Sequence, residues 1–227
     1  MSAARVGNAV RAVFQKDVSQ ELRRRVALVA VFFFAATALA LVSYAIGPYG
    51  LRAEDRPALQ SALLWIVLFF AAATGLPRAF VREEETGTAL ALRKTVPASV
   101  VLAGKTLFNA LLFMAVAAVT IPGFALLLEW RVASPLALAA TVLLGGVGLA
   151  VVSTFLSAVV AAAGQRNVLF VLIAFPLLLP LLLVSIAATL EATRGGMPWT
   201  GLRVLVAYDG AAAGAAYMLV ESVWGED

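Results

Sequence analysis

Gly104-Lys105-Thr106 is the stretch of this sequence that most resembles a site for phosphate chemistry. A phosphate-binding loop ends in Gly-Lys-Ser/Thr and needs another glycine five residues before the second one, where its backbone amides surround the phosphates. Position 99 is serine, and the tripeptide lies in an apolar stretch rather than after a strand. We therefore interpret Lys105 as a cation at the cytoplasmic edge of a membrane segment and expect no nucleotide site in this chain.

The 227 residues include neither histidine nor cysteine. The usual zinc ligands, the Ser-His and Cys-His pairs of nucleophilic catalysis, and the commonest axial ligands of haem all need one of these two residue types. The sequence therefore predicts that the chain is not an enzyme and that it binds neither a metal nor a cofactor itself. Asp209 is the one ionisable residue well inside an apolar stretch, which disfavours a proton relay of the kind found in pumps.

Apolar residues make up 63% of the chain and charged residues 13%, whereas soluble domains have about 45–50% and about 25%. A helix of about 20 apolar residues crosses the hydrocarbon core of a bilayer. The predicted spans are 26–46, 59–77, 99–127, 135–163, 167–190 and 203–224. The predicted fold class is therefore all-α: a polytopic membrane protein with six transmembrane helices, in which residues 1–227 form one domain.

Prolines and an aspartate interrupt some of these spans. Three prolines are expected to kink their helices, because proline lacks a backbone donor: Pro122, Pro176 and Pro180. Asp209 either faces the protein interior near the periplasmic side, or follows a short interfacial helix at 198–208, with the membrane helix starting near Gly210. We favour the second alternative.

Glycines in the fourth and sixth spans are candidate helix-packing positions, because small residues let membrane helices approach closely. They are Gly145 and Gly148 in the fourth span, and Gly210 and Gly214 in the sixth. Contact within the bundle and contact with a second copy of the chain are both open for the Gly210–Gly214 pair.

The distribution of positive charge predicts the orientation. Twelve of the 17 Lys and Arg residues lie on one predicted side and five on the other, which places both termini in the cytoplasm. The basic, amphipathic stretch 1–25 is expected to form an interfacial helix whose arginines face anionic lipid, although a solvated tail is an alternative. Because these charges act as topology signals, we expect no nucleic-acid partner.

The segment between the second and third spans is the most informative one. Ala89, Leu92 and Val96 recur at helical spacing, which predicts a short cytoplasmic helix with one apolar side, suited to docking on a partner. A solvated connecting loop is the alternative. The candidate residues of this segment are Arg82, Glu83, Glu84, Glu85, Thr86, Gly87, Thr88, Leu92 and Pro97.

These features together carry a resemblance to a known family. The run from Arg82 to Thr88 is followed by Pro97 and Lys105, then by Leu144-Gly145 through Phe155-Leu156, Phe175 to Pro180, and Ala207-Tyr208-Asp209. In this order and spacing, nearly the whole chain resembles the small permease subunits of ABC exporters. Within that group it is most similar to the haem exporter protein B family (CcmB) of cytochrome c maturation.

The resemblance implies a permease of the bacterial inner membrane that pairs with a separate ABC ATPase subunit, with two copies of each subunit. A haem-handling membrane protein and a small helper would complete the complex. The segment from Glu83 to Thr88 would be the coupling helix on the ATPase, ATP would bind in that partner, and haem would be cargo of the complex. The output would be haem export or release of a haem-loaded chaperone; the absence of His and Cys favours release.

Two alternatives to haem delivery stay open on the sequence. One is a related ABC exporter subunit with another lipophilic cargo. The other is a membrane assembly scaffold without a transport role, which would not affect the ATP turnover of a partner.

Overall fold

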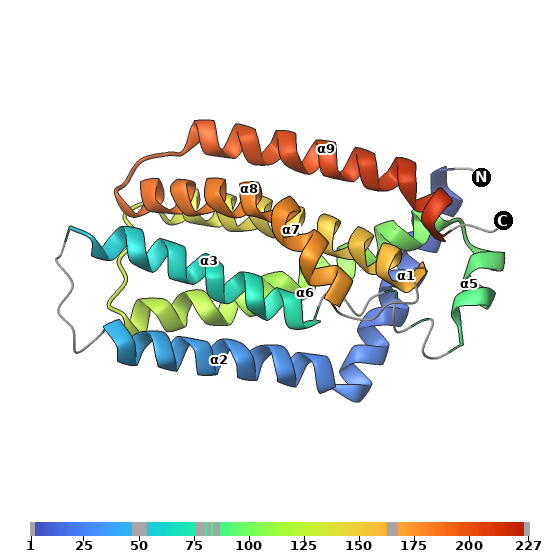
Figure 1. Ribbon diagram of the computed structural model, residues 1–227, viewed down its shortest axis with the longest axis horizontal. Helices are drawn as coiled ribbons and strands as arrows, with labels where there is room; N and C mark the ends of the chain where they lie inside the picture. The colour runs from blue at the N-terminus through green and yellow to red at the C-terminus, as the bar shows by residue number, and fades with distance from the viewer. Residues whose placement is uncertain are drawn as a thin grey trace.

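The computed structural model describes residues 3–46, 54–75, 80, 83, 87–162 and 168–224. Helices are the only regular elements in these ranges (Figure 1). They are α1 (Ala3–Arg24), α2 (Val26–Ile46), α3 (Arg56–Gly75), α5 (Ala89–Thr95), α6 (Ala98–Leu127), α7 (Pro135–Ala162), α8 (Val168–Thr193) and α9 (Trp199–Trp224). The predicted all-α class is confirmed for the described part of the chain.

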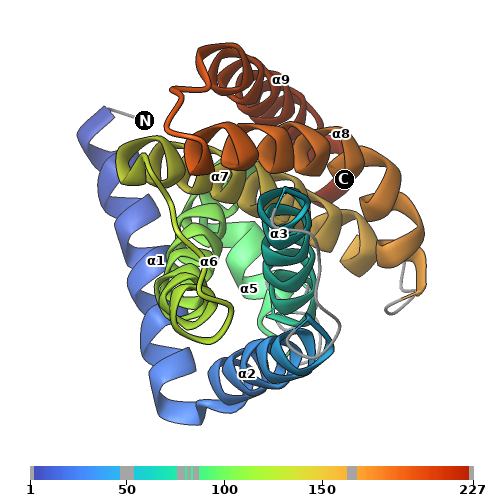
Figure 2. The same ribbon diagram turned by 90° about the vertical axis from the view of Figure 1, so that its left-hand side faces the viewer.

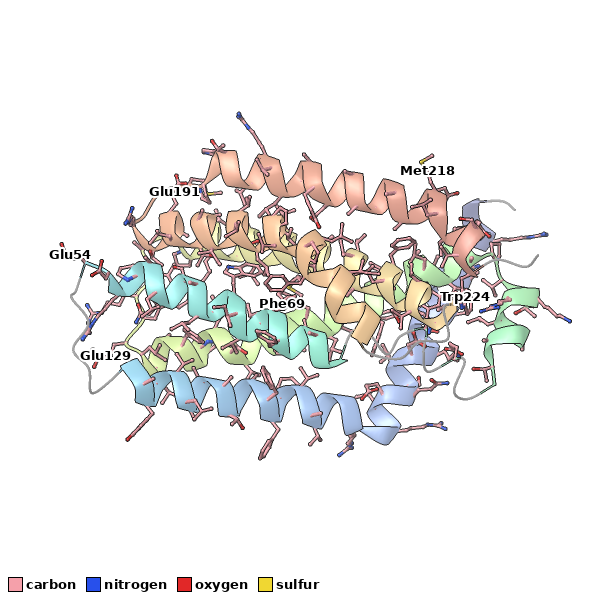
Figure 3. All side chains as sticks on the ribbon, in the orientation of Figure 1. Glu54, Phe69, Glu129, Glu191, Met218 and Trp224 are labelled. Atoms are coloured by element: carbon pink, nitrogen blue, oxygen red, sulfur yellow. The ribbon has the colours of Figure 1, made fainter. Side chains whose placement is uncertain are left out.

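Most of the described helices run along the long axis of the molecule, and α1 and α5 lie at one end of it (Figure 1). α2, α3, α6, α7, α8 and α9 form the bundle, while α1 and α5 lie at the end that also holds both chain termini (Figure 1). Seen from the opposite end, α1 passes along the outside of α6, and α2 and α9 lie on opposite sides of the bundle (Figure 2). Glu54, Glu129 and Glu191 mark the end opposite to Trp224 (Figure 3).

Among the described residues, five helices are long and apolar enough to cross a membrane. They are α3, α6, α7, α8 and α9, and each lies within a few residues of a predicted span. α2 coincides with the first predicted span, but its apolar stretch within the described residues is the shorter Val29–Ala45. The chain is therefore a multi-pass membrane protein, and the sixth crossing by α2 stays a prediction.

A break at Arg25 separates α1 from α2. Arg25 has φ 53°, in the left-handed region that non-glycine residues rarely adopt, and its Nε donates to the carbonyl of Leu22 at 3.3 Å. Because the chain turns here, α1 leaves the bundle direction and lies across α6. The predicted N-terminal helix is present, and its place in the headgroup layer stays a prediction.

The main core is built around Trp65 of α3, which is fully buried. Its Nε1 donates to Oγ1 of Thr189 in α8 at 2.8 Å, and its ring lies 6.3 Å from that of Phe113 in α6. Gly145 of α7 faces this ring: a Cβ at position 145 would overlap the indole and would lie 2.8 Å from Ser185 Oγ. The absence of a side chain at Gly145 therefore lets α3, α7 and α8 meet.

The favoured interpretation of the last span was wrong. α9 is one helix from Trp199 to Trp224, without a separate interfacial helix at 198–208. Asp209 is buried, and its two carboxylate oxygens have no hydrogen-bond partner among the described residues. The carboxylate lies where a Cβ on Gly148 of α7 would be, so the missing side chain of Gly148 makes room for it. Asp209 thus faces the interior of the bundle, as in the other alternative.

Gly210 and Gly214 differ from Gly145 and Gly148, because they face outward. No described atom lies within 4 Å of a Cβ built at either position, and the neighbouring Met218 is 79% exposed (Figure 3). Of the two sequence alternatives, contact within the bundle does not occur in the described structure. Contact with a second copy stays a prediction.

The prolines lie inside continuous helices. α6 continues through Pro122, and α8 continues through Pro176 and Pro180, although each proline removes one backbone donor. Kinks at these three positions stay predictions.

Candidate functional site

The segment between α3 and α6 lies at the end of the bundle that holds the termini (Figure 1). Of its candidate residues, Glu83, Gly87, Thr88, Leu92 and Pro97 can be placed. Four others lie outside the described residues: Arg82, Glu84, Glu85 and Thr86. The structure therefore tests the two ends of the candidate loop and leaves its acidic middle untested.

The short helix predicted in this segment is present as α5. Gly87 precedes it with φ 69° and open space around it, a backbone conformation that favours glycine. Ala89 is buried and Leu92 half-buried, as expected for the apolar side of the helix, whereas Ala91 and Lys94 are exposed. One side of α5 therefore packs on the bundle, and the other is exposed.

Pro97 separates α5 from α6. It is exposed and extended, with φ −54° and ψ 142°, and its carbonyl accepts from the amides of Val100 and Val101 at 3.0 and 3.2 Å. Because proline cannot continue a helix from its N-terminal side, α5 ends at Thr95 and α6 begins at Ala98. The segment thus reaches the bundle through a fixed turn.

A group of four charges, here called the charged cluster, lies beneath this segment and consists of Lys16, Asp17, Glu83 and Lys105. Lys105 Nζ donates to Asp17 Oδ2 at 3.2 Å and to Glu83 Oε1 at 3.0 Å. Lys16 Nζ donates to both carboxylate oxygens of Glu83 at 2.8 Å. Two positive and two negative groups thus join α1, the segment and α6.

The charged cluster is largely shielded from solvent. The side chain of Lys105 is 1% exposed and that of Glu83 is 4% exposed, while Lys16 at the rim is 32% exposed. Thr88 Oγ1 adds a hydrogen bond to Glu83 Oε2 at 2.5 Å. A buried charge is tolerated only when it is paired and hydrogen-bonded, so these contacts offset the cost of burying the cluster.

The pKa values of the two carboxyl groups shift in opposite directions. Burial raises the pKa of Asp17, because Lys105 only partly compensates for the lost hydration. Burial would also raise the pKa of Glu83, but the charge of Lys105 and hydrogen bonds from Lys16 and Thr88 outweigh it and lower the pKa to about 2. Glu83 is therefore the carboxylate that the cluster holds in its ionised form.

We expect acid to loosen this attachment between pH 4.5, the ordinary pKa of the glutamate, and about 2, its pKa in the folded chain. Above pH 4.5 the stabilisation from ionised Glu83 is complete, and it is lost as the pH falls toward 2. Asp17 acts in the opposite direction, because protonation removes the cost of burying its charge. At neutral pH, Glu83→Gln should therefore lower the free energy of unfolding. Between pH 4.5 and 2, the variant should lose less stability than the wild type does. Thermal unfolding in detergent at several pH values measures this.

Glu54→Gln is the control for this pH profile, because Glu54 is exposed at the opposite end of the bundle. It should leave the profile unchanged. If Glu83→Gln and Glu54→Gln gave the same profile, the stabilising role of ionised Glu83 would be contradicted.

The approach of α1 to α6 depends on Gly104, which precedes Lys105. A Cβ at Gly104 would lie 2.7 Å from Cβ of Val13 and 3.1 Å from the carbonyl oxygen of Val10. At this point the backbone of α6 therefore lies directly against the side chain of Val13 in α1. Gly104 and Lys105 thus act as a contact point for α1, and the place of Lys105 at the cytoplasmic edge of the membrane stays a prediction.

Sequence analysis missed Lys16 and Asp17 as partners of the segment. One signal was present: Val13, Asp17 and Glu21 recur every four residues and share one face of α1. All three are buried. Two acidic residues in line with a buried valine indicate a helix face that meets a cation.

A sequence model of the family described as CcmB protein matches residues 8–219, nearly the full length of the chain. No curated protein matched the sequence with significant similarity. The matched range includes α1 from its second turn, the charged cluster, α5 and most of α9. The chain therefore belongs to the CcmB protein family, whose members are membrane components of haem export in cytochrome c maturation.

Proposed function

We propose that this chain is the permease subunit of an ABC complex and that α5 is its docking site for the ATPase subunit. The observation that carries the proposal is the asymmetry of α5. Its apolar side packs on the bundle, while Ala91 and Lys94 on the other side are exposed. A short amphipathic helix with one free side suits docking on a partner.

The charged cluster supports this role because it fixes the segment that leads into α5. Glu83 contacts Lys16 of α1 and Lys105 of α6, and Thr88 contacts Glu83 immediately before α5 begins. A push on α5 would therefore be transmitted to two helices instead of being absorbed by a loose loop. In this mechanism ATP is bound and hydrolysed in the partner, and this chain moves as packed helices do, by shifts of nearly rigid bodies.

The proposed orientation places α5 and both termini in the cytoplasm. The excess of Lys and Arg on that predicted side supports it. The membrane would be the bacterial inner membrane, where a cytoplasmic ATPase can reach α5.

Haem is the proposed cargo of the complex, handled by partners of this chain. The absence of His and Cys leaves only methionine, tyrosine and weaker groups as ligands for haem iron. We therefore propose that this subunit transmits movement, and that a haem-handling membrane protein with its small helper holds the cargo. A second copy of this chain would complete the membrane part.

Reversing the charge of the exposed side of α5 should release the ATPase. The double variant Ala91→Glu/Lys94→Glu is expected to reduce the ATPase retained in mild-detergent pull-down by about tenfold or more, a loss of about 1.4 kcal/mol or more. The reason is that the change affects the docking side while leaving the packed side of α5 intact. The double variant should also stimulate the ATP turnover of the ATPase less than the wild-type chain does.

Arg131→Glu is the matched control, because Arg131 is exposed and follows α6 at the opposite end of the bundle. It should retain the ATPase. A single cysteine at position 91, in a chain without native cysteine, should react with an impermeant maleimide from the cytoplasmic side. Equal ATPase capture by both variants would argue against docking at α5, and a lack of any stimulation by the wild-type chain would favour an assembly scaffold.

A further inference from the structure

A second hydrophobic core lies at the end of the bundle that holds α5, apart from the main core around Trp65. It brings together four elements: α5, the first turns of α6, the last turns of α7 and the last turns of α9. Its fully buried residues are Phe80, Val101, Ala158, Val220 and Trp224. The C-terminal end of α9 is thus packed together with the proposed docking helix.

Trp224 is the centre of this contact. It is fully buried, and its ring meets that of Phe80 edge to face, with centroids 4.8 Å apart and an interplanar angle of 77°. The guanidinium of Arg93 in α5 lies over the same indole, 4.9 Å from the ring centroid. Edge-to-face and cation–π contacts both have preferred geometries. One indole therefore holds the segment at two points, one before α5 and one inside it.

Two hydrogen bonds fix the surroundings of this indole. The amide of Phe80 donates to Ser157 Oγ of α7 at 2.9 Å. One turn before Trp224, Glu221 Oε1 accepts from the amide of Ser99 at 3.1 Å, at the N-terminus of α6, where a carboxylate is electrostatically favoured. The end of α9 is therefore attached to the start of α6 and, through the packed indole, to α5.

The whole length of α9 packs on the bundle through one face. Its buried face is a single line of residues: Leu202, Leu205, Asp209, Ala216, Val220 and Trp224. Along that line, Asp209 has no hydrogen-bond partner among the described residues. The opposite face, with Gly210, Gly214 and Tyr217, is exposed. The middle of α9 is attached to α8 by the hydrogen bond that Tyr208 Oη donates to the carbonyl of Leu177 at 2.6 Å, and its C-terminal turns carry the contacts with Phe80, Arg93 and Ser99.

We propose that α5 and the last turns of α9 form one rigid unit, in which Trp224 is the positioning residue. A displacement of α5 then passes into α9 directly, in addition to passing through the chain into α6. The displacement itself rests on the proposed function, whereas the rigid unit does not.

The rigid unit is tested on the isolated chain in lipid nanodiscs. Spin labels on cysteines at Lys94 and Ser222, both exposed, should give one narrow distance distribution in the chain, which lacks native cysteine. Trp224→Phe keeps an aromatic contact with Phe80 and should keep the distribution narrow, whereas Trp224→Ala should broaden it. Arg93→Gln is a milder variant that should also broaden the distribution. It keeps the test valid if Trp224→Ala does not fold. Tyr217→Ala, on the outward side of the same helix, is the control.

The transmission is tested in the complex with the ATPase, with labels at Tyr44 on α2 and Met218 on α9, both exposed. Binding of a non-hydrolysed ATP analogue should shift this distance in the wild type and in Trp224→Phe. Trp224→Ala or Arg93→Gln should reduce the shift while still retaining the ATPase in pull-down. A broad distance distribution between labels at positions 94 and 222 in the wild type would overturn the proposal. So would a distribution that stays narrow in both Trp224→Ala and Arg93→Gln, or a nucleotide-dependent change in the distance between positions 44 and 218 that is as large in these variants as in the wild type.

Failure of the proposed function has a different signature. If the wild-type chain retains no ATPase, docking at α5 is wrong, yet the 94–222 distribution in the isolated chain still decides whether α5 and α9 form one unit.

Discussion

Lys105→Met is expected to lower the free energy of unfolding by about 3–5 kcal/mol, the cost of removing one partner from a buried ion pair. Lys105 is 1% exposed and contacts both Asp17 and Glu83. Without it, the two carboxylates lose their most buried cationic partner, while the partly exposed Lys16 still contacts Glu83. Methionine fills much of the same volume, so the loss reports the missing charge more than a cavity. Unfolding in detergent measures it, and limited proteolysis shows whether α1 detaches.

Two further variants make this result specific to the charged cluster. Lys94→Met removes an exposed lysine of α5 and should change the free energy of unfolding by about 0.5 kcal/mol or less. Asp17→Asn combined with Lys105→Met should recover part of the loss, because it also removes one of the stranded charges. Equal effects of Lys105→Met and Lys94→Met would refute the stabilising role of the cluster.

The same geometry decides which residues can serve in a test of ATPase docking. Glu83 faces inward between Lys16 and Lys105. A lysine at position 83 would place three positive charges together and disturb the fold of the chain. Loss of the ATPase in that variant would not identify a docking surface, and for this reason the docking test uses Ala91 and Lys94.

Gly145→Leu should destabilise the bundle by about 3 kcal/mol or more, at or above the upper end of the range for overpacked cores. Even a Cβ at this position overlaps the ring of Trp65 and approaches Ser185. The larger side chain would displace the indole and break its hydrogen bond to Thr189. Thermal unfolding in detergent and the yield of monodisperse protein measure the effect, and Gly145→Ala should give a smaller loss.

Gly214→Leu is the matched substitution on the outward face of α9, where a Cβ has open space. We expect a change of about 0.5 kcal/mol or less in the free energy of unfolding. The comparison separates a glycine needed inside the chain from one that is free for contact with a second copy. If Gly214→Leu destabilised the chain as much as Gly145→Leu, the outward orientation of this face would be wrong.

Hydropathy predicted most of the membrane helices because bilayer thickness sets their length independently of their neighbours. α6 and α7 begin and end within one residue of the predicted spans. The start of α9 was mispredicted because Asp209 interrupts its apolar stretch. A charged residue is not expected inside a membrane helix unless another helix leaves space for its side chain. That space is at Gly148, about 60 residues earlier in the sequence.

Local patterns predicted α5, since Ala89 and Leu92 define its apolar side without reference to other elements. The charged cluster was not predictable in this way. Its bond between Lys105 and Asp17 joins residues 88 positions apart, and each partner taken singly is typical of a charge in solvent or at a membrane edge. Tertiary contact decided the role of Lys105. The description of residues 1–227 as one permease domain stays a prediction.

The pairing of early carboxylates with a later lysine has a consequence for biogenesis. A ribosome adds Asp17 to the chain 88 residues before Lys105, so Asp17 lacks this counter-ion until α6 is being synthesised. The N-terminal helix can settle on the bundle only after the third hydrophobic segment has left the translocon. Truncated nascent chains ending before that segment should therefore leave α1 open to protease.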